Sequence, residues 1–262
     1  MHEEESFEAL LAKANAGDAE AQNAVGRVIA SRGDAHSRAE SEEWFRRAAE
    51  QGLPRAKHNL GVLYLRDDLR AEALKWFGEA AKDGWLPSIF AFGKICEEDG
   101  ETERAKRCFE SAAQRGHAES QDALGRIYFE RDTEADHVIA RRWSEAAAAQ
   151  GVAAAHTRLG TIYHEGLGTS RDPQRAAVCF LEGANRGHAG AQLMIGAAFD
   201  VGAGVRRDKV EAAKWILRCA GQGNEIAHAY VQTLKKELRP EEFEDAVRRS
   251  RQPLSPTNDP TT

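Results

Sequence analysis

The chain has 262 residues and a formal net charge of -6; charged residues make up 30% of it, hydrophobic residues 42%, and only seven residues are proline. Such a composition is typical of helix-rich proteins whose helices are amphipathic. The acidic balance argues against nucleic acid as a partner, because phosphate recognition normally requires a basic excess or a clear basic run.

The N-terminal segment Met1–Glu5 is acidic, and no uninterrupted apolar stretch follows it. A secretory signal would instead begin with basic residues and continue with an apolar region. No stretch of the chain approaches the length of a membrane span. We therefore expect a cytoplasmic location and no membrane span.

Two series of glycines recur along the chain in a fixed phase. Neighbouring members of the first series, the joint glycines, are 32 to 36 residues apart, and each of the first six is followed nine residues later by a glycine of the second series, the inner glycines. The joint glycines are Gly17, Gly52, Gly84, Gly116, Gly151, Gly187 and Gly223, and the inner glycines are Gly26, Gly61, Gly93, Gly125, Gly160 and Gly196. A period of this length predicts a solenoid of two-helix repeats.

The joint glycines define a single repeat domain over residues 1–252. It begins with a partial cap helix at residues 5–16, where Phe7, Leu10 and Leu11 precede the first joint. The predicted repeats are residues 18–52, 53–84, 85–116, 117–151, 152–187 and 188–223, followed by C-terminal cap helices at 225–250. The last of these helices is rich in charge, as expected where one face meets water. Residues 253–262 have little to bury and should be disordered.

Each repeat carries an apolar stripe in the helix before its joint glycine. In the last full repeat this stripe consists of Ala212, Trp215, Ile216 and Cys219, which have the i, i+3, i+4, i+7 spacing of one helix face. An inner glycine in the helix after the joint costs about 1 kcal/mol of helix propensity relative to alanine, so its recurrence indicates close packing against a neighbouring helix. A larger side chain there should overpack that contact by roughly 1–3 kcal/mol.

The repeats at 152–187 and 188–223 share a set of motif residues. In the second repeat these include Ala191-Gln192, Ile195-Gly196, Gly202-Ala203-Gly204-Val205, Asp208 and Ala212. This pattern resembles the Sel-one-like repeat family, a relative of the tetratricopeptide repeat. The resemblance implies an all-α, right-handed α-solenoid of helical hairpins that binds proteins or peptides, commonly in bacterial signalling or complex assembly, and that has no catalytic machinery.

The residue types that usually carry chemistry form no recognisable constellation. Counted from the joint glycines, Cys108 and Cys179 stand where other repeats have tryptophan, so we interpret them as core residues. The same count places Cys96 in a tyrosine position and Cys219 in an alanine position. The histidines lack the spacing of a metal site. The chain contains no Ser-x-x-Lys, Gly-x-Ser-x-Gly or His-Glu-x-x-His motif. We therefore expect no catalytic residues, no cofactor and no metal.

The concave face of the solenoid is the predicted binding surface. In helical-hairpin solenoids the first helix of each repeat lines this face, and we expect the side chains three residues before and one, four and five residues after the inner glycine to point into it. The hypothetical partner-binding residues are Arg27, His58, Leu65, Arg66, Phe90, Lys94, Asp122, Arg126, Phe129, Thr161 and His164, and the same positions include Ser31 and Val62.

These residues predict a mixed surface. Leu65, Phe90 and Phe129 would be exposed apolar anchors, and a basic track of Arg27, Arg66, Lys94 and Arg126 would pair with acidic side chains or a carboxylate of the partner. The interpretation is a non-enzymatic scaffold or adaptor that binds a protein or peptide. Two alternatives remain open at this point: a hydrolase with a peptide or cell-wall binding groove, and an architectural protein that associates with itself.

Overall fold

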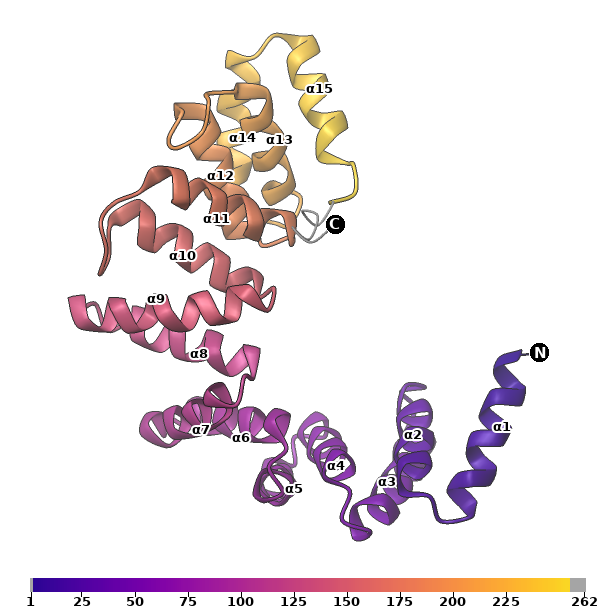
Figure 1. The fold of residues 1–262 in the computed structure, drawn as a ribbon. Helices are drawn as coiled ribbons and strands as arrows, with labels where there is room; N and C mark the ends of the chain where they lie inside the picture. The colour runs from indigo at the N-terminus through magenta and orange to yellow at the C-terminus, as the bar shows by residue number, and fades with distance from the viewer. Residues whose placement is uncertain (1, 255–262) are drawn as a thin grey trace, which may run out of the picture. The chain divides into compact units, whose positions relative to one another are not determined.

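A computed structural model describes residues 2–254 of the chain, with side chains from residue 7 onward. Within that range the chain is all-helical, with fifteen α-helices and no strand (Figure 1). The predicted fold class, an α-solenoid of helical hairpins, is confirmed. The expected disorder of the C-terminal segment falls largely on residues 255–262, which lie outside the described residues.

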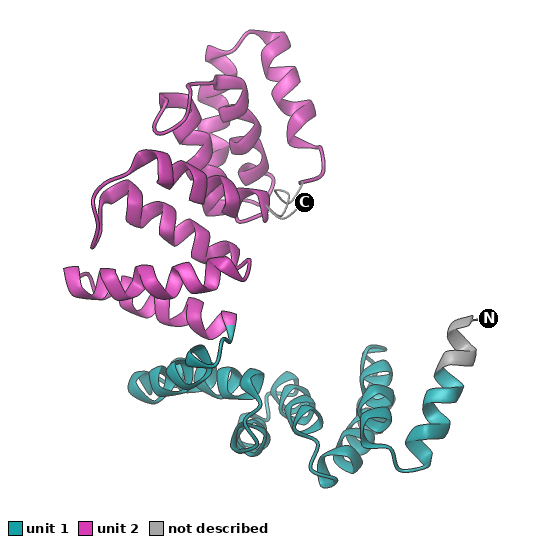
Figure 2. Cartoon of the chain, in the orientation of Figure 1, with its two compact units in different colours: residues 1–117 teal, residues 118–262 magenta. Residues whose placement is uncertain are grey.

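The helices divide between two compact units that meet in sequence at His117 and Ala118 (Figure 2). Unit 1 contains α1 (His2–Asn15), α2 (Ala19–Ala30), α3 (Ala35–Glu50), α4 (Pro54–Arg66), α5 (Arg70–Lys82), α6 (Leu86–Glu98) and α7 (Thr102–Gln114). Unit 2 contains α8 (Ala118–Phe129), α9 (Glu134–Ala149), α10 (Ala153–Glu165), α11 (Pro173–Asn185), α12 (Ala189–Val201), α13 (Lys209–Ala220), α14 (Glu225–Glu237) and α15 (Pro240–Ser250).

From α2 onward the helices pair as hairpins, and we call the two members of a hairpin its A and B helices. The even-numbered helices up to α12 are A helices and the odd-numbered helices up to α13 are B helices. Each A helix packs against its own B helix, and within each unit it also packs against the helix before it, as α4 does against α3 and α12 against α11. Neighbouring A helices also touch within each unit, as α2 does with α4 and α10 with α12.

The joint glycines end the B helices by a defined capping motif. At the second joint glycine, Gly52, φ is 86°, which an L side chain rarely adopts. Its N–H donates to the carbonyl of Ala49 at 2.9 Å, and the next N–H, of Leu53, donates to the carbonyl of Ala48 at 3.2 Å. These two bonds form a Schellman motif, which satisfies carbonyls that the helix end leaves free. The glycine therefore turns the chain directly into the next A helix.

The inner glycines mark close contacts between the A and B helices of one repeat. A Cβ atom at Gly61 would lie 2.6 Å from the ring of Phe77, and one at Gly93 would lie 2.8 Å from the ring of Phe109. Both phenylalanines are almost completely buried. The packing reason predicted for the inner glycines is therefore confirmed.

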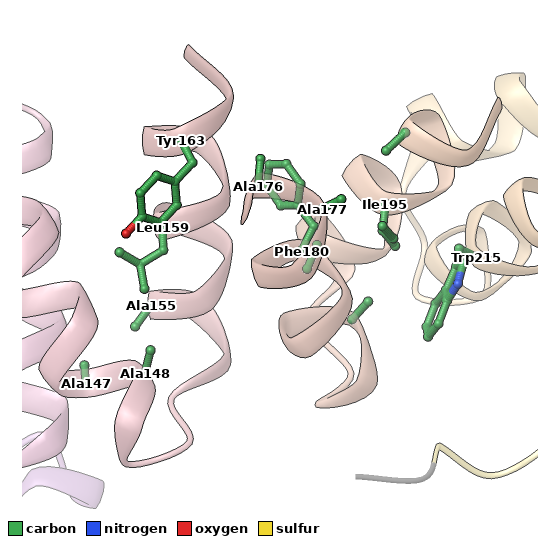
Figure 3. Packing of buried hydrophobic residues seen from close by; sticks show 13 residues of the cluster. Ala147, Ala148, Ala155, Leu159, Tyr163, Ala176, Ala177, Phe180, Ile195 and Trp215 are labelled. Carbon is green, nitrogen blue, oxygen red and sulfur yellow. The ribbon is translucent and has the colours of Figure 1, made fainter. Parts of the chain in front are cut away.

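The apolar stripes of the hairpins form the core of each unit. In unit 2 the stripes of α10, α11, α12 and α13 meet in one cluster that includes Leu159, Phe180, Ile195 and Trp215 (Figure 3). In unit 1 a similar cluster extends from α3 to α6 and includes Phe77. The helices are consequently held by neighbours along the array and need no single central core.

The four cysteines are free thiols, but only two of them occupy fully buried positions. Cys96 and Cys219 are buried, as predicted, whereas Cys108 and Cys179 are half-buried. Burial raises the pKa of the Cys179 thiol to about 11, with Glu145 and Glu182 adding to the effect. The interpretation of Cys108 and Cys179 as full core residues is therefore wrong, because their position lies at the edge of the core, where Trp76 and Trp143 are half-buried as well.

Candidate functional site

A groove in unit 1 lies between the A helices α2 and α4. Its volume is about 240 Å³, and its lining includes Arg27, Ser31, Phe45, Val62, Leu63 and Arg66. Arg27, Ser31, Val62 and Arg66 occupy positions counted from the inner glycines as concave-face positions, so the structure brings these predicted residues together.

Local packing explains why this groove forms. Gly26 allows α2 to lie against the ring of Phe45, since a Cβ there would come within 2.7 Å of the ring. Phe45 thus becomes an apolar floor between the two A helices. Asn59 of α4 donates a hydrogen bond of 2.7 Å from Nδ2 to Oδ1 of Asn23 in α2, and Asn23 is almost fully buried. This bond fixes the two helices at a constant separation beside the floor.

Two exposed arginines flank the floor. Arg27 and Arg66 lie in the last turns of α2 and α4, and neither pairs with a carboxylate among residues 7–254. The carboxylate nearest in sequence to Arg66 is Asp67, and it forms an ion pair with Arg38. The groove therefore presents two guanidinium groups whose charge is not neutralised within the unit.

The neighbouring acidic side chain Glu42 is likewise engaged. Burial opposes its ionisation, but hydrogen bonds from Tyr64, Arg46 and Arg38 outweigh burial and hold the pKa of Glu42 below its usual value. This network engages the charge of Glu42 within the unit. The positive potential at Arg27 and Arg66 consequently remains available to a partner.

The other charged residues of the predicted set have partners within the chain. Nζ of Lys94 lies 2.6 Å from Glu97, and a guanidinium nitrogen of Arg126 lies 3.2 Å from Glu130. Asp122 accepts a 2.9 Å hydrogen bond from Arg158 of the next repeat, whose side chain is only 10% exposed. Of the predicted basic track, Lys94 and Arg126 therefore have carboxylate partners on their own helices, whereas Arg27 and Arg66 do not have one in the described residues.

The predicted apolar anchors differ in their exposure. Leu65 is 40% exposed, as expected, but Phe90 and Phe129 are half-buried. The ring of Phe90 packs against Phe109 at a centroid distance of 5.6 Å and against His117 at 5.3 Å. The ring of Phe129 packs against a histidine of its own B helix at 5.8 Å. The prediction of solvent-exposed phenylalanines is wrong, because an aromatic ring gains more from packing on the B helix than from facing water.

The remaining predicted residues, His58, Thr161 and His164, lie outside the groove at Arg27 and Arg66. His58 hydrogen-bonds through Nδ1 to Oγ of Ser88 at 2.9 Å, and burial lowers its pKa below the usual value. Thr161 is half-buried and donates at 3.3 Å to the carbonyl four residues earlier in its helix. His164 lies at the edge of a largely apolar pocket of about 240 Å³ that includes Phe180 and Met194. These three residues share no groove with Arg27.

A recurring polar clip between repeats was not predicted. The residue four before an inner glycine pairs with the residue one before the next joint glycine. The pairs are Gln22–Gln51 at 2.8 Å, Lys57–Asp83 at 2.5 Å, Gln121–Gln150 at 2.8 Å and Gln192–Gln222 at 2.9 Å. The spacing of Gln22 and Gln51 recurs at Gln121 and Gln150, so counting polar residues from the glycines could have found it.

The described part of the chain offers few sites for other chemistry. No three His, Cys, Asp or Glu side chains in residues 7–254 are grouped so that they could hold a metal ion. No helix of that range is both long and apolar enough to cross a membrane. Among the charged residues predicted for the concave face, Arg27 and Arg66 therefore stand out, because they line a groove and have no carboxylate partner in the described residues.

Comparison with known families agrees with the repeat pattern. The Sel1 repeat model matches the chain six times, over residues 19–53, 54–85, 89–117, 118–152, 153–188 and 189–224. The chain belongs to the Sel1 repeat family. Proteins of this family are in general protein-interaction scaffolds. No curated protein matches the chain by sequence.

Solved structures of bacterial Sel1 repeat proteins resemble the chain. One is a protective antigen of uropathogenic Escherichia coli strains with an SLR fold, which is 27% identical, has a TM-score of 0.84 and covers 94% of this chain. The match includes 55% of the antigen, so this chain spans about half of its length. A Sel1 repeat protein from Oxalobacter formigenes is 23% identical with a TM-score of 0.69, and the match covers 88% of this chain and 97% of that protein.

Proposed function

We propose that this Sel1 repeat protein is a non-enzymatic peptide-binding module that holds an acidic segment of a partner protein in the groove of unit 1. One observation carries the proposal: Arg27 and Arg66 flank an apolar floor and have no carboxylate partner in the described residues. An acidic side chain or a C-terminal carboxylate of the partner would form ion pairs with both guanidinium groups.

The chemistry of the groove suits a short anchor. Arginine binds carboxylates through parallel N–H···O bonds, which are stronger than bonds between neutral groups. The floor of Phe45 and Leu63 accepts an apolar side chain next to the acidic one. The volume of about 240 Å³ is below the roughly 300–1,000 Å³ of sites for drug-sized ligands, so one or two side chains would fill it.

The cellular role that we propose is that of a scaffold or adaptor in bacterial signalling or complex assembly. Family membership and the bacterial origin of both structural relatives support this role. A cytoplasmic location fits the four free thiols, because cysteines stay reduced in that compartment.

The two alternative functions differ from this proposal in testable ways. A hydrolase would need an acid, a base or an activated nucleophile in the groove, whereas its charged groups are arginines, which keep their protons at physiological pH. The hydroxyl of Ser31 donates to the carbonyl of Val28 at 2.7 Å. A self-associating protein would show a mass that rises with concentration in light scattering. A peptide-binding module should stay at one mass and catalyse no hydrolysis of the peptide that it binds.

A selection from a displayed library of random peptides on the full chain tests the proposal. We expect the selected peptides to be acidic, and a labelled peptide from the selection should bind in fluorescence anisotropy. The double variant Arg27→Glu/Arg66→Glu should raise its Kd more than about tenfold, because charge-assisted hydrogen bonds contribute about 1.5–3 kcal/mol each.

A second double variant controls for net charge. Arg142 and Arg206 are exposed, lie in unit 2 and have no carboxylate partner within residues 7–254. Arg142→Glu/Arg206→Glu makes the same change in net charge away from the groove and should leave the Kd unchanged. Equal effects of the two double variants, or selected peptides without acidic residues, would contradict the proposal.

A further inference from the structure

One position of the repeat, eight residues before each joint glycine, holds the largest side chain of the B helix in most repeats. Its occupants are Trp44, Trp76, Cys108, Trp143, Cys179 and Trp215. At Cys108 the structure contains an open surface cavity of about 610 Å³, lined by residues of α5, α6 and α7 of unit 1. Figure 1 shows where these three helices lie in the chain. The size is within the range of roughly 300–1,000 Å³ that is usual for ligand sites.

The cavity is open because the side chains on two of its sides are small. Gly78 and Ala81 of α5 face it from one side, and Cys108 and Ser111 of α7 face it from the other. A Cβ at Gly78 would lie 3.8 Å from the ring of Phe92, so nothing crowds that wall. The space is thus the result of several small residues together.

The last full repeat shows what the same position accommodates. There Trp215 is 3% exposed and belongs to the core cluster that includes Ile195 of the preceding A helix (Figure 3). Two cations cover its ring, with Nζ of Lys214 at 4.5 Å and the guanidinium carbon of Arg218 at 5.7 Å from the ring centre. The geometry between two successive B helices is therefore compatible with a buried indole ring beside a cation.

The repeat of Cys108 retains the cation but lacks the ring. Arg107 precedes Cys108 as Lys214 precedes Trp215, and it is exposed without a carboxylate partner in the described range. Arg104 lies on the same rim, with its guanidinium carbon 4.8 Å from the centre of the Phe92 ring. Arg104 also pairs with Glu101 at 2.7 Å, so Arg107 is the cation of the rim that has no carboxylate partner in the described range. The cavity thus combines an apolar lining with one unpaired guanidinium group.

The other cysteine of this position provides a contrast. Cys179 has Glu145 and Glu182 as neighbours, close enough to raise its pKa. Two long acidic side chains therefore stand where the cavity at Cys108 has Gly78 and Ser111. Glu145 and Glu182 are paired with Arg141 and Arg186, so Cys179 has long, ion-paired side chains as neighbours, whereas Cys108 has small ones.

We propose that the cavity at Cys108 binds an aromatic side chain, preferably tryptophan, from a partner segment that carries a carboxylate next to it. The ring occupies the space that Trp215 fills in its own repeat and stacks against Phe92, where cation–π contact with Arg104 adds to the binding. The carboxylate pairs with Arg107. This site shares no residue with the groove at Arg27 and Arg66, so the inference does not depend on the proposed function.

The probe for this site is a short labelled synthetic peptide with one tryptophan flanked by aspartates, measured by fluorescence anisotropy with the full chain. We expect Cys108→Trp to raise the Kd more than about tenfold, because the new indole would occupy the cavity as Trp215 occupies the equivalent position of its own repeat. Cys108→Ser leaves the cavity open and should preserve binding. A peptide with alanine in place of tryptophan should bind at least about tenfold more weakly.

Arg107→Glu tests the same site without placing a large side chain in the cavity. It should weaken the tryptophan peptide, whereas Arg142→Glu, at the same position of the repeat that holds Trp143, should not. Arg27→Glu/Arg66→Glu should leave this Kd unchanged, which separates the cavity from the groove. Absence of binding by the unaltered chain, or equal Kd values for the unaltered chain, Arg107→Glu and a folded Cys108→Trp variant, would overturn the proposal.

Discussion

Replacing two helical glycines of unit 1 by alanine should have different effects on stability, one stabilising and the other neutral to destabilising. In both helices alanine gains about 1 kcal/mol of helix propensity over glycine. At Gly78 of α5 the new methyl group would lie 3.8 Å from Phe92, which is an ordinary contact. At Gly61 of α4 it would lie 2.6 Å from the ring of Phe77, which is 1% exposed and enclosed by the core.

The expected magnitudes follow from these distances. Gly78→Ala should raise the free energy of unfolding by about 1 kcal/mol, since only the propensity changes. Gly61→Ala adds an overpacking cost of roughly 1–3 kcal/mol that outweighs or cancels the same gain. The two variants should therefore differ by roughly 1–3 kcal/mol.

Urea denaturation of the full chain, followed by circular dichroism, measures this difference. Both glycines belong to unit 1, so both variants report on the same part of the array. The reasoning would be refuted if Gly61→Ala stabilised the protein as much as Gly78→Ala does, because the inner glycine would then have no packing role.

The polar contacts between repeats lead to two further predictions. Gln22 donates a hydrogen bond of 3.1 Å to the carbonyl of Ala14 and accepts one from Gln51, so Gln22→Ala should lower the free energy of unfolding by about 1–3 kcal/mol. The control Gln114→Ala, on the exposed side of α7, should change it little. Equal urea midpoints of the two variants would contradict this prediction. Burial lowers the pKa of His58 in the folded state. As the pH decreases below about 6.5, the unfolded chain therefore binds more protons than the folded chain, and the free energy of unfolding decreases. His58→Gln should reduce that loss in thermal melts between about pH 6.5 and pH 5, and an unchanged slope would show that His58 is not responsible.

The repeat architecture could be predicted because glycine has two separable roles in it. Gly52 permits the left-handed turn of a helix end, and Gly61 permits a close crossing, so both positions are constrained by backbone geometry. Apolar stripes of fixed phase then assign the faces of the helices. No long-range information is needed for this step, because each repeat contacts mainly its neighbours.

The binding surface could be predicted only in part, because helix positions do not show which charges are already paired. Arg27 and Arg66 lie in the groove as the inner glycines indicate. The pair Arg126–Glu130 has the i, i+4 spacing of a helix ion pair and could have been recognised in the sequence. The bond between Asp122 and Arg158 joins two repeats, and it requires the register of neighbouring A helices.

The cavity at Cys108 could not be predicted from the sequence pattern, because its volume depends on side chains of several helices. The small residues Gly78 and Ser111 belong to different helices, and their joint effect becomes visible only when α5 and α7 are placed side by side. The half-burial of Phe90 likewise becomes visible only in the folded structure, because its ring packs against Phe109 of the B helix. Side-chain direction, which follows from packing, limits any surface prediction from spacing.

The most direct test of the central claim is to locate a selected acidic peptide on the full chain by hydrogen–deuterium exchange. The account predicts increased protection in α2 and α4 around Arg27 and Arg66, and none when Arg27→Glu/Arg66→Glu replaces the unaltered chain. Protection elsewhere with no change in α2 and α4, or protection that survives the double substitution, would contradict it.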